Sequence, residues 1–534
     1  MSLLGDLKMY SRFAVSLRRF LSRSVTPEEA REVVRQRLQD REGNFLRQAE
    51  RSIFGHPGSP YLPLLALARI GLDDLREWVR SDGLENTLRR LREAGVYFSF
   101  EEFKGRRPVV RGGQEIHVRP ADFDNPFLSR DYEGTTSGST GAGTRVVLDL
   151  DHLAAIACNV LLVHETHGTR GMPSAVWFGM PPDLSSLYAI LLATRIGQTP
   201  RAWFSTPAGP GARPALKFRL VGRAFPVLAR LYGAPIPDPV PLELEQAGVL
   251  ADWAVERVKA DGGCRITTHV SKVLRVCLAA AERGLDLTGT VFYCSGEPPT
   301  PAKVRGITAT GARVVPTYFF METGAVGYGC GNPADENDIH FFRDMLALIR
   351  HPGTAPGNEP VESFHFTTLL PTAPKILLNV ESDDCGVVEE RKCGCLLESC
   401  GFTEHLREIR SYRKLVGEGV TLIGAEMVGI LEDVLPARFG GSALDYQLVE
   451  EEDERGFTRV TLVISPRVGV LDESEVVRTV LEALGRSGGS ATIAADGWAR
   501  AGSLRVRRAD PIWNPRGKFM SIVRAGALDP ASRR

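Results

Sequence analysis

Short apolar runs alternate with longer amphipathic stretches through the middle of the chain. The runs that have the length and composition of buried strands are 175–180, 265–269, 290–294 and 313–317. Between them, residues 274–283 and 301–309 place apolar side chains at helical spacing. Alternation of this kind from residue 132 to about residue 386 predicts an α/β fold, with mixed or parallel sheets flanked by helices.

Residues 1–120 predict a helix-rich N-terminal extension. Residues 26–51 are charged and periodic, and Thr26 followed by Pro27 is a typical helix start. Residues 72–94 predict a further helix. An amphipathic helix before them carries its apolar residues on one face: Phe13, Leu17, Phe20 and Leu21. We expect that face to pack against the body of the protein, with a membrane surface as the alternative.

The tail from about residue 418 has a different pattern. Residues 444–450 and 458–465 predict a strand pair around a polar turn, 473–484 a helix and 503–508 another strand. We therefore expect a large N-terminal domain over residues 1–417 and a small α+β lid domain over residues 418–534. The chain has 534 residues, a length that also favours at least two domains.

Charge and cysteine usage narrow the function classes. Lysine plus arginine and aspartate plus glutamate both number 65, so the formal net charge is zero and nothing indicates nucleic-acid binding. No apolar run approaches the roughly 18 residues that span a bilayer. Polar residues interrupt the apolar stretches behind the basic N-terminus, which disfavours a secretory signal. The nine cysteines then favour reduced thiols and a cytoplasmic location.

One segment combines glycines and hydroxyl side chains just before an apolar strand. It contains Thr136, Ser137, Gly138, Ser139, Thr140, Gly141 and Thr144. Glycines let the backbone approach an anion, and N–H groups and hydroxyls can then surround phosphate oxygens. The Walker pattern with its lysine is absent. Taken alone, the segment is either a phosphate-binding loop or a flexible linker.

The pattern T-S-G-S-T-G resembles the phosphate loop of the adenylate-forming superfamily, which includes acyl-CoA ligases, luciferases and peptide-synthetase adenylation domains. Thr144, where lysine is common, resembles the phenylacetate-CoA-ligase branch. Further resemblances follow in order along the chain. They are Ser295-Gly296-Glu297-Pro298, Tyr318 to Glu322, Asp384-Cys385-Gly386, Arg410 with Gly419, and Asn514 to Lys518.

The resemblance implies roles for these residues. It places Gly296, Glu297 and Pro298 along the adenine, Tyr318 stacked on it, and Asp384 on the ribose hydroxyls. It makes Glu322 a Mg²⁺ ligand, Arg410 a residue of the interdomain hinge, and Lys518 the lysine that bonds the substrate carboxylate and the α-phosphate. Departures are Phe319 and Met321 in the Tyr318 motif, and Tyr412 and Arg413 at the hinge. The alternative for Asp384 is a loop carboxylate in an acidic run, and the alternative for Lys518 is a surface lysine in a basic tail.

Four of the nine cysteines fall within a short window, from Cys385 to Cys400. Cys393 and Cys395 resemble the C-P-C-G segment of the same branch, and Cys330 with His340 resembles its upstream pair. Such residues suit a tetrahedral structural zinc. Cys385 and Cys400 are further candidates for ligands, and a set of unligated thiols is the alternative.

The resemblance implies an enzyme that uses ATP and Mg²⁺ to convert a carboxylic acid, expected to be aryl or arylalkyl, into an acyl-adenylate. The acyl group would then pass to a thiol, with coenzyme A expected first. A carrier-protein phosphopantetheine or an amine is an alternative acceptor. A degenerate, non-catalytic binding protein is the alternative from another class. An acyl carrier protein and a homodimer stay open as partners.

Overall fold

The structure is a computed structural model of the chain. The residues that it describes are 3–128, 132–135, 145–180, 183–207, 216–296, 299–355, 359–411, 414–417, 420–423, 427, 429–441, 443–455, 457–487, 489–512 and 521–524. No helix within these ranges has the length and apolar content needed to cross a bilayer.

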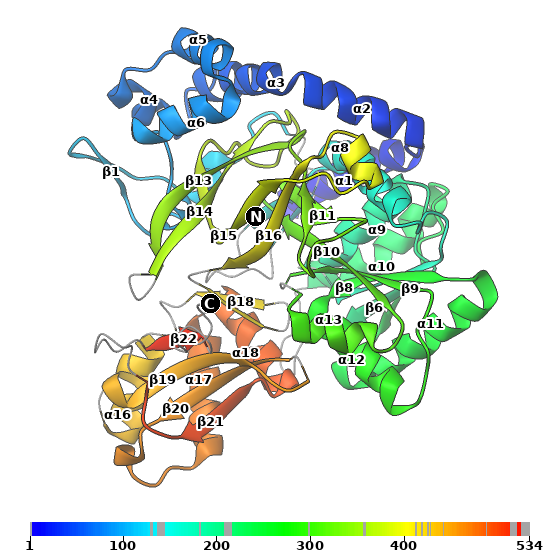
Figure 1. The fold of residues 1–534 in the computed structure, drawn as a ribbon, viewed down its shortest axis with the longest axis vertical. Helices are drawn as coiled ribbons and strands as arrows, with labels where there is room; N and C mark the ends of the chain where they lie inside the picture. The colour runs from blue at the N-terminus through cyan, green and yellow to red at the C-terminus, as the bar shows by residue number, and fades with distance from the viewer. Residues whose placement is uncertain are drawn as a thin grey trace.

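Helices form the N-terminal part of the fold, and several of them run across the top of Figure 1. They are α1 (Leu3–Leu21), α2 (Pro27–Gln39), α3 (Arg41–Gln48), the π-helix η1 (Ala49–Phe54), α4 (Leu62–Ala68), α5 (Leu72–Asp82), α6 (Leu84–Glu93) and α7 (Phe100–Phe103). In α1, Phe13, Leu17 and Phe20 are at most 5% exposed and join the main hydrophobic core, so the predicted packing against the body is confirmed.

Two predicted helices are divided in the structure. The segment 26–51 starts as expected, because the Thr26 side chain caps α2 by accepting a hydrogen bond from the Glu29 amide, but it breaks at Asp40 between α2 and α3. The segment 72–94 breaks at Gly83, whose φ of 78° lies in the left-handed region that ends a helix. Side-chain periodicity continued through both breaks and so concealed them.

A 12-stranded sheet forms the centre of the large domain, in the order β13-β14-β15-β16-β12-β11-β10-β9-β8-β5-β6-β7. Its parallel half contains β5 (Ser174–Gly179), β6 (Ala202–Thr206), β7 (Pro239–Pro241), β8 (Cys264–His269), β9 (Thr290–Ser295) and β10 (Arg313–Phe320). The predicted strands coincide with β5, β8, β9 and β10. The helices of this half are α8 (Leu150–Thr166), α9 (Ser185–Arg195), α10 (Leu216–Leu231), α11 (Ala247–Asp261), α12 (Val270–Glu282) and α13 (Pro301–Thr308).

From β10 onward the expectation of strand–helix alternation is wrong. The next strands are antiparallel: β11 (Gly324–Gly329), β12 (Ile339–Phe341), β13 (Leu346–Ala355), β14 (Glu359–Thr368), β15 (Val380–Glu390) and β16 (Glu404–Ser411). Short connections suffice for antiparallel strands, so no crossover helix is required here. The small elements of the large domain are β1 (Val109–Arg111), β2 (Gln114–Ile116), η2 (Pro120–Phe123), β3 (Tyr132–Thr135), β4 (Arg145–Leu148), η3 (Leu244–Gln246) and α14 (Leu396–Ser399).

A smaller α+β unit follows, in orange and red in the lower part of Figure 1. Its sheet has the order β21-β20-β19-β22, built from β19 (Tyr446–Glu452), β20 (Thr458–Ile464), β21 (Leu504–Arg508) and β22 (Ile522–Arg524). The remaining elements are β17 (Lys414–Gly417), β18 (Val420–Ile423), η4 (Ile430–Val434), α16 (Leu435–Phe439), η5 (Ala443–Asp445), η6 (Pro466–Val468), α17 (Glu473–Ser487) and α18 (Gly489–Ala501). It has a hydrophobic core of its own, which includes Leu448, Leu462 and Trp498. The predicted fold class, a large α/β domain with a small C-terminal α+β domain, is confirmed.

Candidate functional site

Motif residues gather at one edge of the parallel sheet. Gly296 directly follows β9, Tyr318 lies in β10, and Glu322 lies in the turn between β10 and β11. The strands β9 and β10 are parallel neighbours with Cys294 opposite Pro316, so Gly296 and Tyr318 lie at the same edge. This edge contains the carboxyl ends of the parallel strands, which is where ligands bind in α/β sheets.

Asp384 reaches this edge from the antiparallel half of the sheet. The Tyr318 hydroxyl donates a hydrogen bond to Oδ2 of Asp384 at 2.6 Å. Phe366 of β14 also contacts the rings of Tyr318 and Phe320, with centroid distances of 6.2 and 5.2 Å. The antiparallel half of the sheet is therefore curved, so that β14 and β15 face β10. The interpretation of Asp384 as a loop carboxylate is wrong, since Asp384 lies within β15 and pairs with Ser411 of β16.

The Tyr318 hydroxyl is a dependable donor to Asp384. Burial raises the pKa of Tyr318 well above its ordinary value, and the neighbouring Asp384 carboxylate raises it further. The phenol therefore stays protonated at neutral pH. The backbone amide of Asp384 is in turn bound to the Ser382 hydroxyl at 3.2 Å. These contacts fix the carboxylate at the position from which it could accept hydrogen bonds from a sugar.

Glu322 forms an ion pair that the sequence did not suggest. Nζ of Lys104, at the end of α7, lies 2.8 Å from Oε1 of Glu322, and the two side chains are 8% and 13% exposed. Burial alone would raise the pKa of Glu322, but the ammonium groups of Lys104 and then Lys375 outweigh it and lower that pKa to about 2. Lys375 itself pairs with Asp124 at 2.7 Å. Glu322 is thus ionised, and any Mg²⁺ that it binds has to compete with Lys104.

We expect Lys104→Met to destabilise the protein by about 3–5 kcal/mol, because it leaves the buried Glu322 carboxylate without its nearest partner. The double change Lys104→Met with Glu322→Gln should recover much of that loss. Urea unfolding of the two single variants and the double variant measures the coupling. Strictly additive losses would show that the pair is not energetically coupled.

Gly296 is required by close packing at the end of β9. Its φ is +83°, and a β-carbon there would lie 2.5 Å from Nδ1 of His269. His269 ends β8, contacts the Phe178 ring at a centroid distance of 4.8 Å, and donates a hydrogen bond from Nδ1 to the Ser295 carbonyl at 3.2 Å. Because that carbonyl can only accept, Nδ1 of His269 carries the proton. The backbone after β9 therefore passes directly over an imidazole.

Several predicted site residues lie outside the described residues. They are Thr136, Ser137, Gly138, Ser139, Thr140, Gly141, Thr144, Glu297, Pro298 and Lys518, together with Tyr412, Arg413 and Gly419 of the hinge motif. Their roles stay predictions. Arg410 is described: it lies on β16 opposite Cys385, exposed, next to the point where the chain leaves the large domain.

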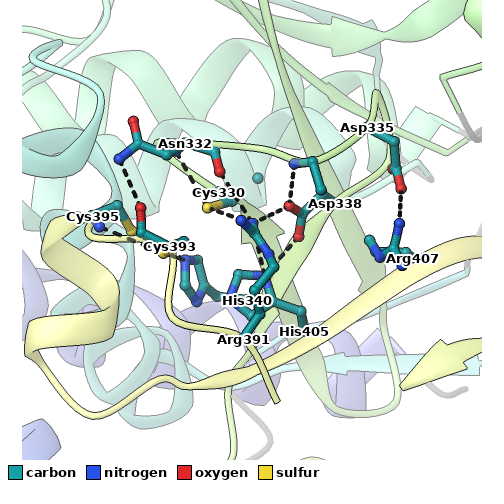
Figure 2. A network of polar contacts seen from close by, with 12 residues as sticks. Cys330, Asn332, Asp335, Asp338, His340, Arg391, Cys393, Cys395, His405 and Arg407 are labelled. Atoms are coloured by element: carbon teal, nitrogen blue, oxygen red, sulfur yellow. Dashed lines mark hydrogen bonds and ion pairs between the residues drawn. The ribbon is translucent and has the colours of Figure 1, made fainter. Parts of the chain in front are cut away.

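A cluster of three cysteines and a histidine lies on the antiparallel half of the sheet (Figure 2). The ligand atoms of Cys330, His340, Cys393 and Cys395 all lie within 4.8 Å of one another. His340 comes from β12, and the two later cysteines come from the segment between β15 and α14. Cys385 instead packs against Val361. Neither Cys385 nor Cys400 belongs to the cluster, so the four residues named from the motif are the ones brought together.

The tautomer of His340 suits metal binding. Nδ1 lies 2.7 Å from the Phe402 carbonyl and must donate to it, so Nε2 carries a lone pair. That lone pair faces the cysteines, with Sγ of Cys395 at 3.1 Å and Sγ of Cys393 at 3.6 Å. A hydrogen bond from the Cys330 thiol lowers the pKa of Cys395 below its ordinary value. A backbone carbonyl that fixes a metal-binding imidazole in this way is typical of zinc sites.

Charged side chains surround the cysteine cluster (Figure 2). Sγ of Cys330 accepts hydrogen bonds from the Asn332 amide at 3.3 Å and from Nη2 of Arg391 at 3.4 Å. Arg391 also pairs with the fully buried Asp338, which accepts a second bond from Nδ1 of His405 at 2.6 Å. The positive charge of Arg391 therefore lies beside the sulfur of Cys330, where a thiolate would form.

No protein-family model matches the chain, and no curated protein matches its sequence. Among solved structures, 2-hydroxyisobutyryl-CoA ligase in complex with 2-HIB-AMP and CoA in the thioesterification state is similar with a TM-score of 0.55 and 14% identity, over 91% of this chain and 89% of that one.

Two further structures are similar at lower scores. An amide bond synthetase McbA mutant from Marinactinospora thermotolerans has a TM-score of 0.41 and 11% identity, over 94% of this chain and 97% of that one. A malonyl-CoA ligase with methylmalonyl-CoA and AMP bound has a TM-score of 0.40 and 14% identity, over 71% of each chain.

This chain has the fold of an acyl-CoA ligase. Four motif residues lie close together on this fold although up to 88 residues separate them in sequence: Gly296, Tyr318, Glu322 and Asp384. The pairing of β9 with β10 brings Gly296 next to Tyr318, and the hydrogen bond from Tyr318 brings Asp384 to the same place. The sequence did not indicate Lys104, because it stands in a strongly charged segment that is typical of a solvated surface. The Ser99 capping box that starts α7 was the one available signal that this segment is ordered.

Proposed function

We propose that this chain is an adenylate-forming acid–thiol ligase. The observation that supports this best is the direct contact between the Tyr318 and Asp384 side chains beside Glu322, on an acyl-CoA ligase fold. In this proposal Asp384 binds the ribose, the Tyr318 ring stacks on adenine, and Gly296, Glu297 and Pro298 line the same base. The loop from Thr136 to Thr144 would surround the phosphates.

The first step would join the acid to AMP. A carboxylate oxygen of the acid attacks the α-phosphorus of ATP, the bond from that phosphorus to the bridging oxygen breaks, and pyrophosphate leaves with the electron pair. Lys518 would hold the attacking carboxylate and the α-phosphate together and balance the charge that develops between them. Glu322 offers an ionised carboxylate of the kind that Mg²⁺ prefers, and bound Mg²⁺ would neutralise the phosphates.

The second step would transfer the acyl group. A thiolate attacks the acyl carbon, the bond from that carbon to the AMP oxygen breaks, and AMP leaves. We propose that the domains 1–417 and 418–534 turn relative to each other between the two steps, about a hinge next to Arg410, so that Lys518 moves away and a thiol can enter. Such gating would let one site perform both steps.

We also propose a chemical class for the acid and for the acceptor. We expect an aryl or arylalkyl acid, as in the phenylacetate-CoA-ligase branch, and coenzyme A as the acceptor. The neighbouring 2-hydroxyisobutyryl-CoA ligase binds an acyl-AMP and CoA, which supports the thiol acceptor. We also propose that Cys330, His340, Cys393 and Cys395 hold a structural zinc, since four protein ligands close the coordination sphere.

The full reaction tests this proposal. The protein should release AMP from ATP only when both a suitable acid and a thiol are present, and mass spectrometry should identify the thioester. Coenzyme A, a phosphopantetheinylated carrier protein and a primary amine should be offered in parallel with aryl and small aliphatic acids. Acid-independent release of phosphate, or no AMP with any pair, would contradict a ligase.

We expect Asp384→Ala to weaken AMP binding about 10–100-fold, because charge-assisted hydrogen bonds to the ribose contribute about 1.5–3 kcal/mol. Tyr318→Phe is the matched control: it removes the hydroxyl that bonds Asp384 but keeps the carboxylate and the aromatic ring, so AMP affinity should change less than about threefold. Isothermal titration with AMP measures both. Unchanged affinity in Asp384→Ala would move the ribose contact elsewhere, first to Asp383.

A further inference from the structure

Arg265 is a buried cation at the opposite edge of the sheet from the motif residues. It lies near the start of β8 and is 2% exposed. Its neighbours Cys264 and Ile266 point into one hydrophobic core, so the Arg265 side chain points to the other face, which α8 and α9 cover. The strand register places Ser174 of β5 beside Arg265 on that face.

The contacts of Arg265 are all neutral. Nη1 donates to Nε2 of His164, and Nη2 donates to the Gln198 carbonyl at 3.3 Å. Burial lowers the pKa of His164 well below its ordinary value, so that ring is uncharged. Burial also lowers the pKa of Arg265, to about 10, which still leaves the guanidinium charged at pH 7. No carboxylate forms an ion pair with Arg265 in the part of the chain that the structure describes.

Polar side-chain atoms of Arg265 and of two neighbouring residues have no hydrogen-bond partner among the described residues. They are Nε of Arg265, Nε2 and Oε1 of Gln198, and Oγ of Ser174. Each of these side chains is at least nine-tenths buried. Nε of Arg265, Nε2 of Gln198 and Oγ of Ser174 are donors, and the bond from Arg265 to the Gln198 backbone carbonyl and its strand register with Ser174 place these three residues next to one another. Buried donors of this kind are normally satisfied.

We propose that Arg265, Gln198 and Ser174 form a buried binding site for a monovalent anion of the chloride type. The anion would accept hydrogen bonds from Nε of Arg265, Nε2 of Gln198 and Oγ of Ser174. It would also neutralise a guanidinium that otherwise lacks a counter-charge in a medium of low dielectric. A folded protein almost never buries an arginine completely without such a partner.

The donor set favours a halide over an oxyanion. A sulfate or phosphate carries several oxygens, and three buried donors would leave most of those oxygens unpaired. A halide has a single acceptor centre that three donors can surround. The site is independent of the proposed ligase activity, because it lies at the amino ends of the parallel strands, and Gly296 and Tyr318 lie at the carboxyl ends.

Bromide provides the direct test, because its anomalous scattering identifies the ion. Crystals of the full-length protein grown in bromide should show an anomalous peak within hydrogen-bond distance of Nε of Arg265, Nε2 of Gln198 and Oγ of Ser174. Crystals of the Arg265→Met variant should lack that peak. Ordered water alone at this position in the wild-type protein, with bromide confined to the surface, would overturn the proposal.

Solution stability gives a second measurement that does not depend on crystals. At constant ionic strength, replacing gluconate by chloride should raise the midpoint of thermal unfolding by about 1 °C for each tenfold increase above Kd. Arg265→Met should lose this dependence. Arg201→Met is the matched control, because Arg201 is exposed just before β6 and pairs with Asp261 at 3.0 Å, so it should keep the chloride response. An equal response in wild type and Arg265→Met would contradict the site.

Discussion

Replacing Lys518 by alanine should lower the rate of acyl-adenylate formation about 10²–10³-fold, which corresponds to about 2.7–4 kcal/mol of lost transition-state stabilisation. The reason is electrostatic. Adenylation brings a carboxylate against an anionic phosphate, and the sequence from Asn514 to Lys518 supplies one lysine on a glycine-containing segment for that position. Pre-steady-state release of pyrophosphate measures this step by itself.

The same variant should form thioester from synthetic acyl-AMP at nearly the wild-type rate, because the proposed second step proceeds after Lys518 has moved away. Arg524 is a matched control: it is a basic residue of β22, six positions after Lys518, and Arg524→Ala should leave both steps within about threefold of wild type. Adenylation within threefold of wild type in Lys518→Ala would remove this lysine from the mechanism. Equal loss of both steps would indicate misfolding.

Purified without chelators, the protein should contain about one zinc per chain, and Cys395→Ser should lose it. We expect that variant to lose more than about 4 kcal/mol of unfolding free energy, because the loss of a structural metal ranks among the largest effects of single substitutions. The Cys395 sulfur lies 3.1 Å from Nε2 of His340, and both side chains are largely buried. Metal analysis and urea unfolding measure the two effects.

Cys400→Ser is the control for the zinc prediction. Cys400 follows α14, five residues after Cys395, is half-buried, and lies outside the cluster of ligand atoms. It should keep the metal and lose less than about 1 kcal/mol. Zinc-free protein that unfolds as cooperatively as the wild type would contradict a structural role for the cluster.

Local sequence patterns predicted four of the six strands in the parallel half, β5, β8, β9 and β10, and missed β6 and β7. The apolar runs around Val176, Ile266 and Val291 are buried on both faces of a parallel sheet, and such strands are recognisable without knowledge of their neighbours. The antiparallel half was not predicted as such, because the direction of strands β11 to β16 depends on connections whose turns leave a weak signal. Periodicity also could not locate the helix break at Gly83.

The motif residues were predictable individually, but their geometry was not. Nothing in the sequence indicates that the Tyr318 hydroxyl reaches Asp384 at 2.6 Å, since this depends on the curvature that brings β15 to β10. The Lys104–Glu322 pair joins residues 218 positions apart, so it likewise requires the folded chain. The cysteine cluster is the opposite case: the four residues named from the family resemblance have ligand atoms that lie together, and the buried neighbours Asp338 and His405 emerged only in the structure.

Acid-dependent exchange of pyrophosphate into ATP is the most direct test of the proposed adenylation. The first step is reversible, so radioactive pyrophosphate should appear in ATP whenever a suitable acid and Mg²⁺ are present, without any thiol. A panel of aryl, arylalkyl and small aliphatic acids should therefore include at least one that supports exchange, and Lys518→Ala should lower that exchange about 10²–10³-fold. If the protein binds Mg-ATP but exchanges no pyrophosphate with any acid of the panel, the chain is a binding protein on a ligase fold and the proposed chemistry is wrong.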